Sequence, residues 1–238
     1  MYSINSRVRY TELNHHMGCM DPYSIINYFQ DCSTFQSEDI GRGLEYLQSH
    51  HRIWLLHCWH LKIEAPARLG DSILISTWPY DFKGFYGYRN FLMQDKQGKL
   101  LASADSLWVY MDTESGKPMR IPEDHGGYIL EPPHPMEPAK RKLELPEGLE
   151  PGNTFRVIKS NIDSYNHVNN GQYIKMAQEF LPEDFLVKSV RVEYRSQAVL
   201  GDTVLPLVAC TPDCCTVVLA DLSHKPYAII EFHGMNII

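Results

Sequence analysis

The chain contains no long apolar run and no excess of positive charge. No apolar stretch of its 238 residues approaches the roughly 18 that a transmembrane helix needs, and the first residues lack the apolar core of a signal peptide. Asp and Glu number 29 against 22 Lys and Arg, which gives a formal net charge of −7. Such a charge argues against binding to nucleic acid or to an anionic membrane. We therefore expect a cytoplasmic protein with neither as a partner.

The six cysteines and the clustered histidines form no metal-site pattern. No two cysteines have the C-x-x-C spacing of zinc or redox sites, and in a cytoplasmic chain we expect free thiols. Histidines occur at His15-His16, His50-His51, His57 and His60, but no cysteine or carboxylate completes a site with them. The sequence thus predicts no bound metal and no cofactor.

A dense polar segment at residues 160–173 is the most informative feature, Ser-Asn-Ile-Asp-Ser-Tyr-Asn-His-Val-Asn-Asn-Gly-Gln-Tyr. A carboxylate (Asp163), an imidazole (His167) and three carboxamides fall within eight positions, just before an apolar periodic segment that predicts a helix. Unpaired backbone amides and the helix dipole at such an N-terminus favour negative charge. This suits acyl transfer, because its transition state places negative charge on a carbonyl oxygen.

The chain also repeats itself once. Segments 61–73 and 192–204 both predict a strand, a Leu-Gly-Asp turn and a second strand. Upstream, segment 8–14 corresponds to 157–163, and each precedes a helix. In this alignment Asn14 stands at the position of Asp163, and Gly18 stands at that of His167, so the first copy lacks the polar motif.

Each copy predicts one amphipathic helix followed by a run of strands. The first helix opens at Asp21-Pro22 and carries Ile25, Ile26, Phe29, Cys32 and Phe35; the second opens near Asn170 and carries Tyr173, Ile174, Ala177, Phe180 and Leu181. Strands are expected at about 52–64, 72–79, 87–94 and 100–111, and at about 188–194, 202–210, 215–222 and 227–234.

One helix with four or five antiparallel strands gives an α+β unit in which the helix packs on a curved sheet. Segment 123–153 is rich in Pro, Gly and charge, which predicts an extended linker. We therefore expect an N-terminal unit at 1–122, the linker at 123–153 and a C-terminal unit at 154–238.

A helix that is wrapped by an antiparallel sheet and entered through Asp-x-x-x-His-Val-Asn-Asn (163–170) resembles the hotdog fold. Two such units in tandem, with the motif only in the second, resemble the acyl-acyl-carrier-protein (acyl-ACP) thioesterases of plants and bacteria. Segments 10–12, 27–37 and 192–195 support the resemblance, which covers nearly the whole chain. It implies an enzyme of fatty acid biosynthesis. This enzyme would hydrolyse the thioester of fatty acyl-ACP, release free fatty acid, and have acyl carrier protein with its acyl-phosphopantetheine arm as partner.

The resemblance assigns the family's catalytic residues only in part. The aspartate falls on Asp163 and the histidine on His167, but the asparagine midway between them in the plant pattern falls on Tyr165, so the neighbouring Asn166 is the candidate. Asp163 would act as general base or as nucleophile, and His167 would orient the water or the thioester. The thiol leaving group needs little proton assistance, because its pKa is about 8.5.

The family's downstream glutamate falls on Gln197 and the adjacent cysteine of the plant pattern on Ala198. A cysteine nucleophile and a carboxylate base are therefore excluded at these two positions, and Gln197 would orient a water through its carboxamide. The developing oxyanion would be bound by backbone amides at the helix N-terminus, those of Val168, Asn169, Asn170 and Gly171.

The same residues have purely structural interpretations. Asp163 would cap the turn before the helix, His167 would be a hydrogen-bonded structural histidine, and Asn169 and Asn170 would be helix caps, which for the two asparagines is the preferred interpretation.

By resemblance, the first copy would house the acyl chain against the apolar face of its helix. Phe29, Trp54, Trp59 and Trp108 are the candidate lining residues, although core packing explains each of them as well.

Two other functions remain open on the same fold, an acyl-CoA thioesterase and a non-catalytic acyl-binding protein. A hotdog dehydratase would need a His/Glu pair, and no acid clearly takes that place. The sequence does not give the preferred acyl chain length, nor whether the protein forms a homodimer. It also leaves open how a negatively charged protein docks an acidic carrier. The densest basic run, 140–142, is equally well explained as a solvated linker.

Overall fold

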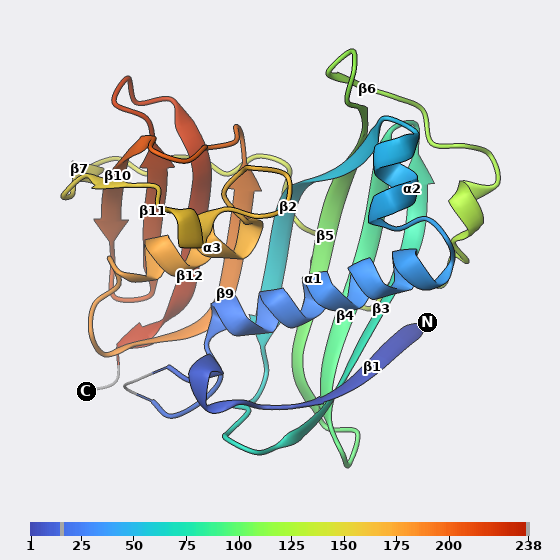
Figure 1. Ribbon diagram of the computed structural model, residues 1–238. Coiled ribbons are helices and arrows are strands. Elements are labelled where there is room, and N and C mark those ends of the chain that lie inside the picture. Colours follow the sequence, from blue (N-terminus) through green and yellow to red (C-terminus); the bar gives the residue numbers. More distant parts are fainter. Residues whose placement is uncertain (15–16, 237–238) are drawn as a thin grey trace. The chain divides into compact units, whose positions relative to one another are not determined.

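The computed structural model describes residues 1–14 and 17–236. These fall into two compact units, Met1–Ala139 and Lys140–Ile238. Each unit has one long antiparallel sheet with a helix on one face, which confirms the expected α+β class and the tandem hotdog arrangement (Figure 1). Among the described residues, no helix is both long enough and apolar enough to cross a membrane.

In the N-terminal unit, helix α1 lies across a sheet with the strand order β1-β3-β4-β5-β2, and β6 pairs with β5 (Figure 1). Its elements are β1 (Tyr2–Arg7), η1 (Tyr10–Glu12), α1 (Pro22–Asp39), α2 (Leu44–Ser49), β2 (Arg52–Ile63), β3 (Ser72–Lys83), β4 (Tyr86–Asp95), β5 (Leu100–Asp112), β6 (Lys117–Pro118) and η2 (His125–Gly127).

In the C-terminal unit, the shorter helix α3 lies on a sheet with the order β9-β12-β11-β10-β7, and β8 pairs with β10. Its elements are β7 (Glu150–Pro151), β8 (Phe155–Arg156), η3 (Lys159–Asn161), α3 (Asn170–Gln178), β9 (Phe185–Tyr194), β10 (Thr203–Cys210), β11 (Cys214–Ala220) and β12 (Pro226–Asn236). All eight predicted strands are present, within a few residues at their ends.

Both main helices begin where the capping residues predict. The Asp21 carboxylate accepts the backbone N–H of Tyr23 at 2.9 Å, with Pro22 as the first helical residue. Asn169 caps α3 by accepting the N–H of Gly171 at 2.9 Å. Each helix then buries an apolar stripe against its own sheet.

Three residues expected on these apolar stripes lie elsewhere. Phe35 is 48% exposed, because the last turns of α1 extend beyond the buried part of the helix. Phe180 and Leu181 are half-buried but follow the end of α3 at Gln178, so the second helix is shorter than the apolar pattern predicts.

Equivalent hydrogen bonds around the Leu-Gly-Asp turns of the two units reflect the internal repeat of the sequence. Val8 donates its backbone N–H to the carbonyl of Asp71 at 3.0 Å, and in the second copy Val157 donates to Asp202 at 2.9 Å. In both copies the aspartate carboxylate of the Leu-Gly-Asp turn accepts the N–H three residues earlier. The turn glycine has φ of 83° at Gly70 and 90° at Gly201, a region that favours glycine.

The predicted linker is held against the N-terminal sheet rather than solvated throughout. Four residues lie side by side in the register of neighbouring strands, on the face opposite α1, and each bonds the linker backbone. The four contacts are Trp78 Nε1 to Pro132 O (2.9 Å), His134 N to Asn90 Oδ1 (2.8 Å), Ala139 N to Asp105 Oδ1 (2.8 Å) and His60 Nδ1 with Glu137 O (2.8 Å).

The linker then enters the C-terminal unit through Leu143. This side chain is buried against Val218 and Ile229, and its N–H donates to Glu193 Oε2 at 2.7 Å. The basic run 140–142 immediately before it is exposed.

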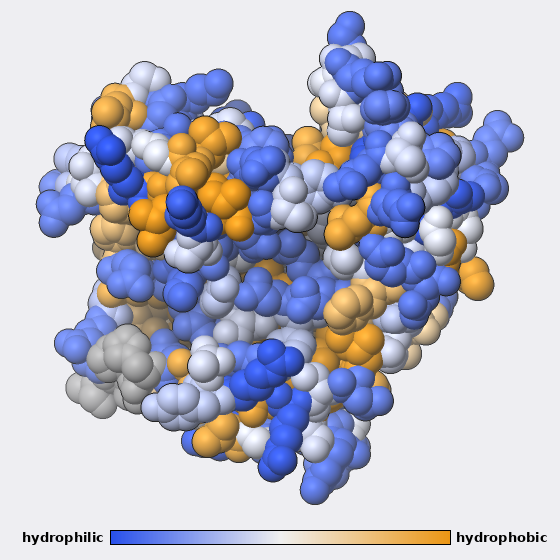
Figure 2. Space-filling view, viewed as in Figure 1, coloured by the Kyte–Doolittle hydropathy of each residue, from blue (hydrophilic) through white to orange (hydrophobic). Residues whose placement is uncertain are grey.

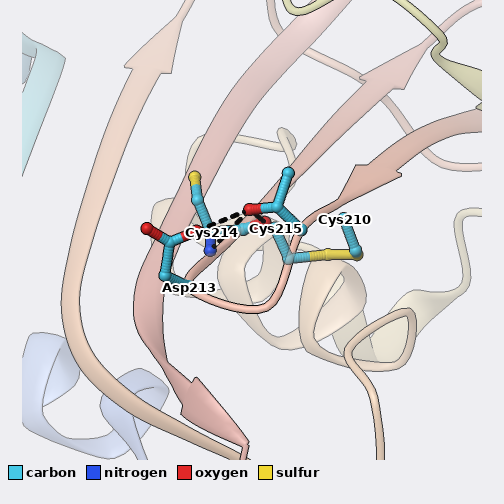
Figure 3. Close-up of a disulfide and its surroundings, with 5 residues drawn as sticks. Cys210, Asp213, Cys214 and Cys215 are labelled. Atoms are coloured by element: carbon cyan, nitrogen blue, oxygen red, sulfur yellow. Dashed lines mark hydrogen bonds between the residues drawn. A yellow bond between two sulfur atoms is a disulfide. The ribbon is translucent and has the colours of Figure 1, made fainter.

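The expectation of six free thiols is wrong for one pair. Cys210 and Cys215 face each other in register at the end of the β10–β11 hairpin and form a disulfide (Figure 3). Cys214 points to the other side of the strand, and in the described part of the chain the remaining four cysteines form no disulfide. The sequence pattern missed this pair because a cross-strand disulfide depends on hairpin register rather than on a characteristic spacing.

Candidate active site

The polar motif forms a tight loop between η3 and α3. A β-bridge joins Ile162 to Val168 and closes the loop, and the N–H of Asp163 donates to the carbonyl of His167 at 2.9 Å. Asn166 has φ of 63°, a conformation that asparagine tolerates better than most residues. The loop thus holds Asp163 and His167 on adjacent, paired backbone segments at the helix N-terminus.

The Asp163 carboxylate stabilises this loop with one oxygen and leaves the other available. Oδ1 accepts the backbone N–H of Tyr165 at 2.8 Å and, more weakly, that of His167 at 3.4 Å. Oδ2 accepts no hydrogen bond from the residues that the structure describes. One carboxylate oxygen therefore caps the turn. The other oxygen, on a half-buried side chain, is available to contact a bound molecule.

The His167 ring is half-buried, and its Nδ1 atom is buried with no hydrogen-bond partner in the described part of the chain. Within the described residues no hydrogen bond joins this ring to Asp163, so the two side chains do not form a preassembled acid–base pair. A buried polar atom without a partner is costly and is usually satisfied by water or a ligand. His167 is therefore suited to receive a hydrogen bond from, or give one to, a bound molecule.

The structure narrows the set of backbone amides that could bind an oxyanion. The amide of Val168 donates to Ala198 O at 3.0 Å, that of Asn169 donates to Asn161 O at 2.9 Å, and that of Gly171 donates to the Asn169 side chain. Three of the four expected donors are thus already used. Asn170 N–H, at the first position of α3, is the one without an acceptor among the described residues.

Tyr173 is a site residue that the sequence pattern showed only as part of an apolar stripe. Its hydroxyl accepts the backbone N–H of Ala198 at 2.8 Å, and the carbonyl of Ala198 accepts the N–H of Val168. Burial is the main cause that raises the pKa of Tyr173 to about 12, with a smaller contribution from the charge of Asp163, so the phenol stays protonated at neutral pH. The two hydrogen bonds of Ala198 therefore join α3, the motif loop and the segment that carries Gln197.

Asn166 and Gln197 are both exposed. Neither side chain makes a hydrogen bond with the described residues, so any contribution of these carboxamides would come through bound water or substrate. Glu179, the other nearby acid, is exposed at the end of α3 as its helical position predicts.

The equivalent loop of the N-terminal unit corrects the alignment by one residue. Its bridge joins Leu13 to Met20, and the N–H of Asn14 donates to the carbonyl of Cys19 at 2.8 Å. Cys19 therefore takes the place of His167, and Gly18, with φ of 59°, takes the place of Asn166. His15 and His16 lie outside the described residues. Within those residues, no three His, Cys, Asp or Glu side chains gather as metal ligands would.

The structure brings three of the four proposed acyl-pocket residues together. Phe29 on α1 lies 6.4 Å from Trp59 between ring centroids, and Trp59 lies 6.4 Å from Trp108. Trp54 belongs to another cluster, with its ring 4.7 Å from that of Tyr110 and packed near α2. Trp59 is 1% exposed, and its Nε1 atom is buried with no acceptor among the residues that the structure describes.

Family models match most of the chain. The acyl-ACP thioesterase N-terminal domain matches residues 2–128, and the acyl-ACP thioesterase C-terminal domain matches residues 149–220. A dodecanoyl-[acyl-carrier-protein] hydrolase of Cinnamomum camphora is 25% identical over 76% of this chain and 52% of its own length. An oleoyl-acyl carrier protein thioesterase of Arabidopsis thaliana is 22% identical over 80% of this chain and 59% of its own length. The chain thus spans between half and three fifths of these curated relatives.

Solved structures show the same fold across the whole chain. An acyl-ACP thioesterase from Bacteroides thetaiotaomicron superposes with a TM-score of 0.88 at 19% identity, covering 97% of this chain and 96% of that one. A 12:0-ACP thioesterase from Umbellularia californica has a TM-score of 0.86 at 18% identity, with 99% and 97% covered. The solved structures agree in fold, and the matches of both family models show that the chain belongs to the acyl-ACP thioesterase family.

Proposed function

We propose that the protein hydrolyses the thioester of fatty acyl-ACP and releases free fatty acid for fatty acid biosynthesis. The observation that carries this proposal is the set of three unfilled polar groups at one loop–helix junction. They are Asp163 Oδ2, the His167 ring and the Asn170 N–H. A base, an orienting group and an oxyanion donor are what thioester hydrolysis requires. Family membership and the similar relatives support the same reaction.

In the proposed reaction Asp163 Oδ2 takes a proton from a water that attacks the thioester carbonyl. His167 orients that water or the thioester, and Asn170 N–H stabilises the negative charge that develops on the carbonyl oxygen. The intermediate collapses by breaking the carbon–sulfur bond, and the pantetheine thiolate leaves and takes up a proton. Direct attack by Asp163 on the carbonyl, followed by hydrolysis of the anhydride, is the second route that the same geometry serves.

The two units would have different roles in the reaction. We infer that the aromatic cluster around Phe29 and Trp59 in the N-terminal unit (1–122) receives the acyl chain, and that the C-terminal unit (154–238) performs the chemistry, with 123–153 as linker. No cofactor enters this reaction. A cytoplasmic location and the choice between monomer and homodimer stay open predictions.

The test compares wild type with Asp163→Asn by release of free thiol from acyl-ACPs and acyl-CoAs of several chain lengths. The asparagine keeps a side-chain oxygen for the N–H of Tyr165, so the loop is preserved while the base is lost. We expect a fall in kcat of about 10²–10⁴-fold on acyl-ACP. Glu179→Gln is the matched control, because it removes the charge of an exposed acid at the end of α3, and its rate should stay at the wild-type value.

Three results would contradict the proposal in different ways. Turnover of CoA esters alone would make the protein an acyl-CoA thioesterase. Saturable acyl binding without turnover in either protein would make it a non-catalytic acyl-binding protein, in keeping with the replacements at Tyr165 and Gln197. Undiminished turnover by Asp163→Asn would remove Asp163 from the mechanism.

A further inference from the structure

Three large apolar side chains are exposed beside the catalytic motif. Ile158 is 57% exposed, Leu200 is 52% exposed and Val199 is 42% exposed. Figure 2 shows apolar surface gathered over the part of the C-terminal unit that carries α3 in Figure 1, with strongly hydrophilic residues beside it. Single exposed apolar residues are ordinary, but several on adjoining segments indicate an interaction surface.

Hydrogen bonds show that these residues lie on adjoining segments and next to the motif. Gly201 N–H donates to the carbonyl of Val157 at 3.0 Å, which places the segment of Ile158 against the Leu-Gly-Asp turn. Ala198, immediately before Val199, accepts the N–H of Val168 at 3.0 Å. The exposed apolar residues therefore border the loop that holds Asp163 and His167.

Two cations flank the same segments. Arg156 in β8 and Lys159 in η3 are both exposed, and neither makes an ion pair with any residue that the structure describes. The nearby acids are engaged: Asp202 accepts the N–H of Val199 and the hydroxyl of Tyr227, and Asp163 caps the motif loop. The cations are therefore available for an outside partner.

We propose that Arg156, Ile158, Lys159, Val199 and Leu200 form the surface on which the acyl carrier protein docks. The proposal rests on the acyl-ACP thioesterase activity proposed above. An acidic carrier with an anionic phosphopantetheine arm is repelled by a chain of net charge −7, so it needs a local region of opposite sign. This surface supplies two unpaired cations around an apolar centre, and it borders the groups that must reach the thioester.

The test uses the double variant Arg156→Glu/Lys159→Glu and two substrates with the same acyl group, acyl-ACP and the small thioester acyl-N-acetylcysteamine. We expect kcat/KM for acyl-ACP to fall about tenfold or more, mainly through KM, and to lose most of its dependence on ionic strength. The small thioester lacks the carrier, so its rate should stay within about twofold of wild type, which also shows that the variant is folded. Leu200→Ser should give the same selective loss on acyl-ACP.

Two charge reversals serve as controls. Lys188→Glu changes an exposed residue near the start of β9, at the other end of the strand from the site, and should leave both substrates unaffected. Arg68→Glu changes the residue at the position of Val199 in the N-terminal copy. A selective loss in Arg68→Glu with no loss in the double variant would place the carrier on the other unit and overturn the proposal.

The two proposals fail in distinguishable ways. If wild type hydrolyses neither substrate, the activity itself is wrong. If wild type hydrolyses acyl-ACP and the double variant does so equally well, the activity stands and the docking surface is wrong. An equal loss on both substrates would show damage to the site rather than to docking and would also overturn the surface.

Discussion

The hydroxyl of Tyr173 accepts the backbone N–H of Ala198 at 2.8 Å, and this bond links the helix after the motif to the segment that carries Gln197. Both partners are buried, Tyr173 to 3% exposure and Ala198 to 0%. Because the carbonyl of Ala198 also accepts the N–H of Val168, one residue joins three parts of the site.

Changing Tyr173 to Phe removes the acceptor and leaves a buried amide unsatisfied. We expect the free energy of unfolding to fall by about 1–3 kcal/mol, and kcat to fall more than KM rises, because the loop that positions Asp163 loses a support. Urea unfolding and steady-state kinetics measure the two effects. Tyr2→Phe, which removes a hydroxyl bonded to Asp39 at an exposed site, should change neither by much.

Replacing Trp59 by Leu should shift the preferred acyl chain toward longer or bulkier groups. Trp59 stacks against Phe29 and packs at a tilt against Phe91 within the proposed acyl-binding cluster, and a smaller side chain leaves space there. Relative kcat/KM over acyl-ACPs of increasing chain length measures the shift. Trp54→Leu enlarges the separate cluster near α2, so its chain-length profile should match wild type; a shift in Trp54→Leu alone would relocate the pocket.

Asp105 is the central anchor of the linker, and Asp105→Ala should weaken the fold. Its carboxylate accepts hydrogen bonds from Ala139 N–H, the Asn90 side chain and Tyr80, all of which would lose a buried acceptor. We expect a loss of about 3 kcal/mol in the free energy of unfolding. Asp95→Ala removes an exposed hairpin acceptor and should cost under about 1 kcal/mol.

The buried carboxyl group of Asp105 also predicts that the stability of the protein depends on pH. Burial raises the pKa of Asp105 above its usual value of 3.8, although its hydrogen bonds act in the opposite direction. The folded protein then binds this proton more tightly than the unfolded chain does. The stability of wild type relative to Asp105→Asn should therefore increase as the pH falls from neutral toward about 4 and diminish as it rises. Urea unfolding midpoints of wild type and Asp105→Asn, measured between neutral pH and about 4, test this expectation. A difference between the two midpoints that does not change with pH would contradict it.

Thiol titration tests the hairpin disulfide. The denatured protein, kept unreduced, should show four thiols, and six should appear after reduction. The bridge closes a short loop, so the double variant Cys210→Ser/Cys215→Ser should lose about 2 kcal/mol or less of stability. Six thiols before reduction would show that the pair stays reduced.

Much of the architecture could be predicted because strands and helix starts depend on local patterns in the amino-acid sequence. Alternating apolar residues predicted the eight long strands, and the Asp21-Pro22 and Asn169 caps predicted both helix starts. Strand β1 was missed, although Tyr2 and Ile4 alternate with polar residues, because its short pattern resembles an irregular N-terminal segment. The end of α3 was also missed, since Phe180 and Leu181 continue the apolar spacing past the last helical residue.

The sequence predicted the motif loop but not the hydrogen bonds within it. The motif located Asp163 and His167, but only the folded loop shows that Oδ1 of Asp163 is used by the turn while Oδ2 remains. Likewise, the candidate oxyanion donors could be reduced from four backbone amides to Asn170 N–H only when the acceptors of the other three were known. The role of Tyr173 had no signal in the sequence beyond its place on an apolar stripe.

By itself, the sequence determined the tandem α+β architecture, the position of the polar motif and the family, because periodicity, capping and a short polar motif are local properties of the chain. Tertiary structure decided what depends on contacts between distant residues. These are the row from Trp78 to His60 that holds the linker, the Cys210–Cys215 bridge, the separation of Trp54 from Trp59, and the bond from Tyr173 to Ala198. Each arises from strand register or from helix packing, which bring together residues whose spacing along the chain carries no pattern of its own.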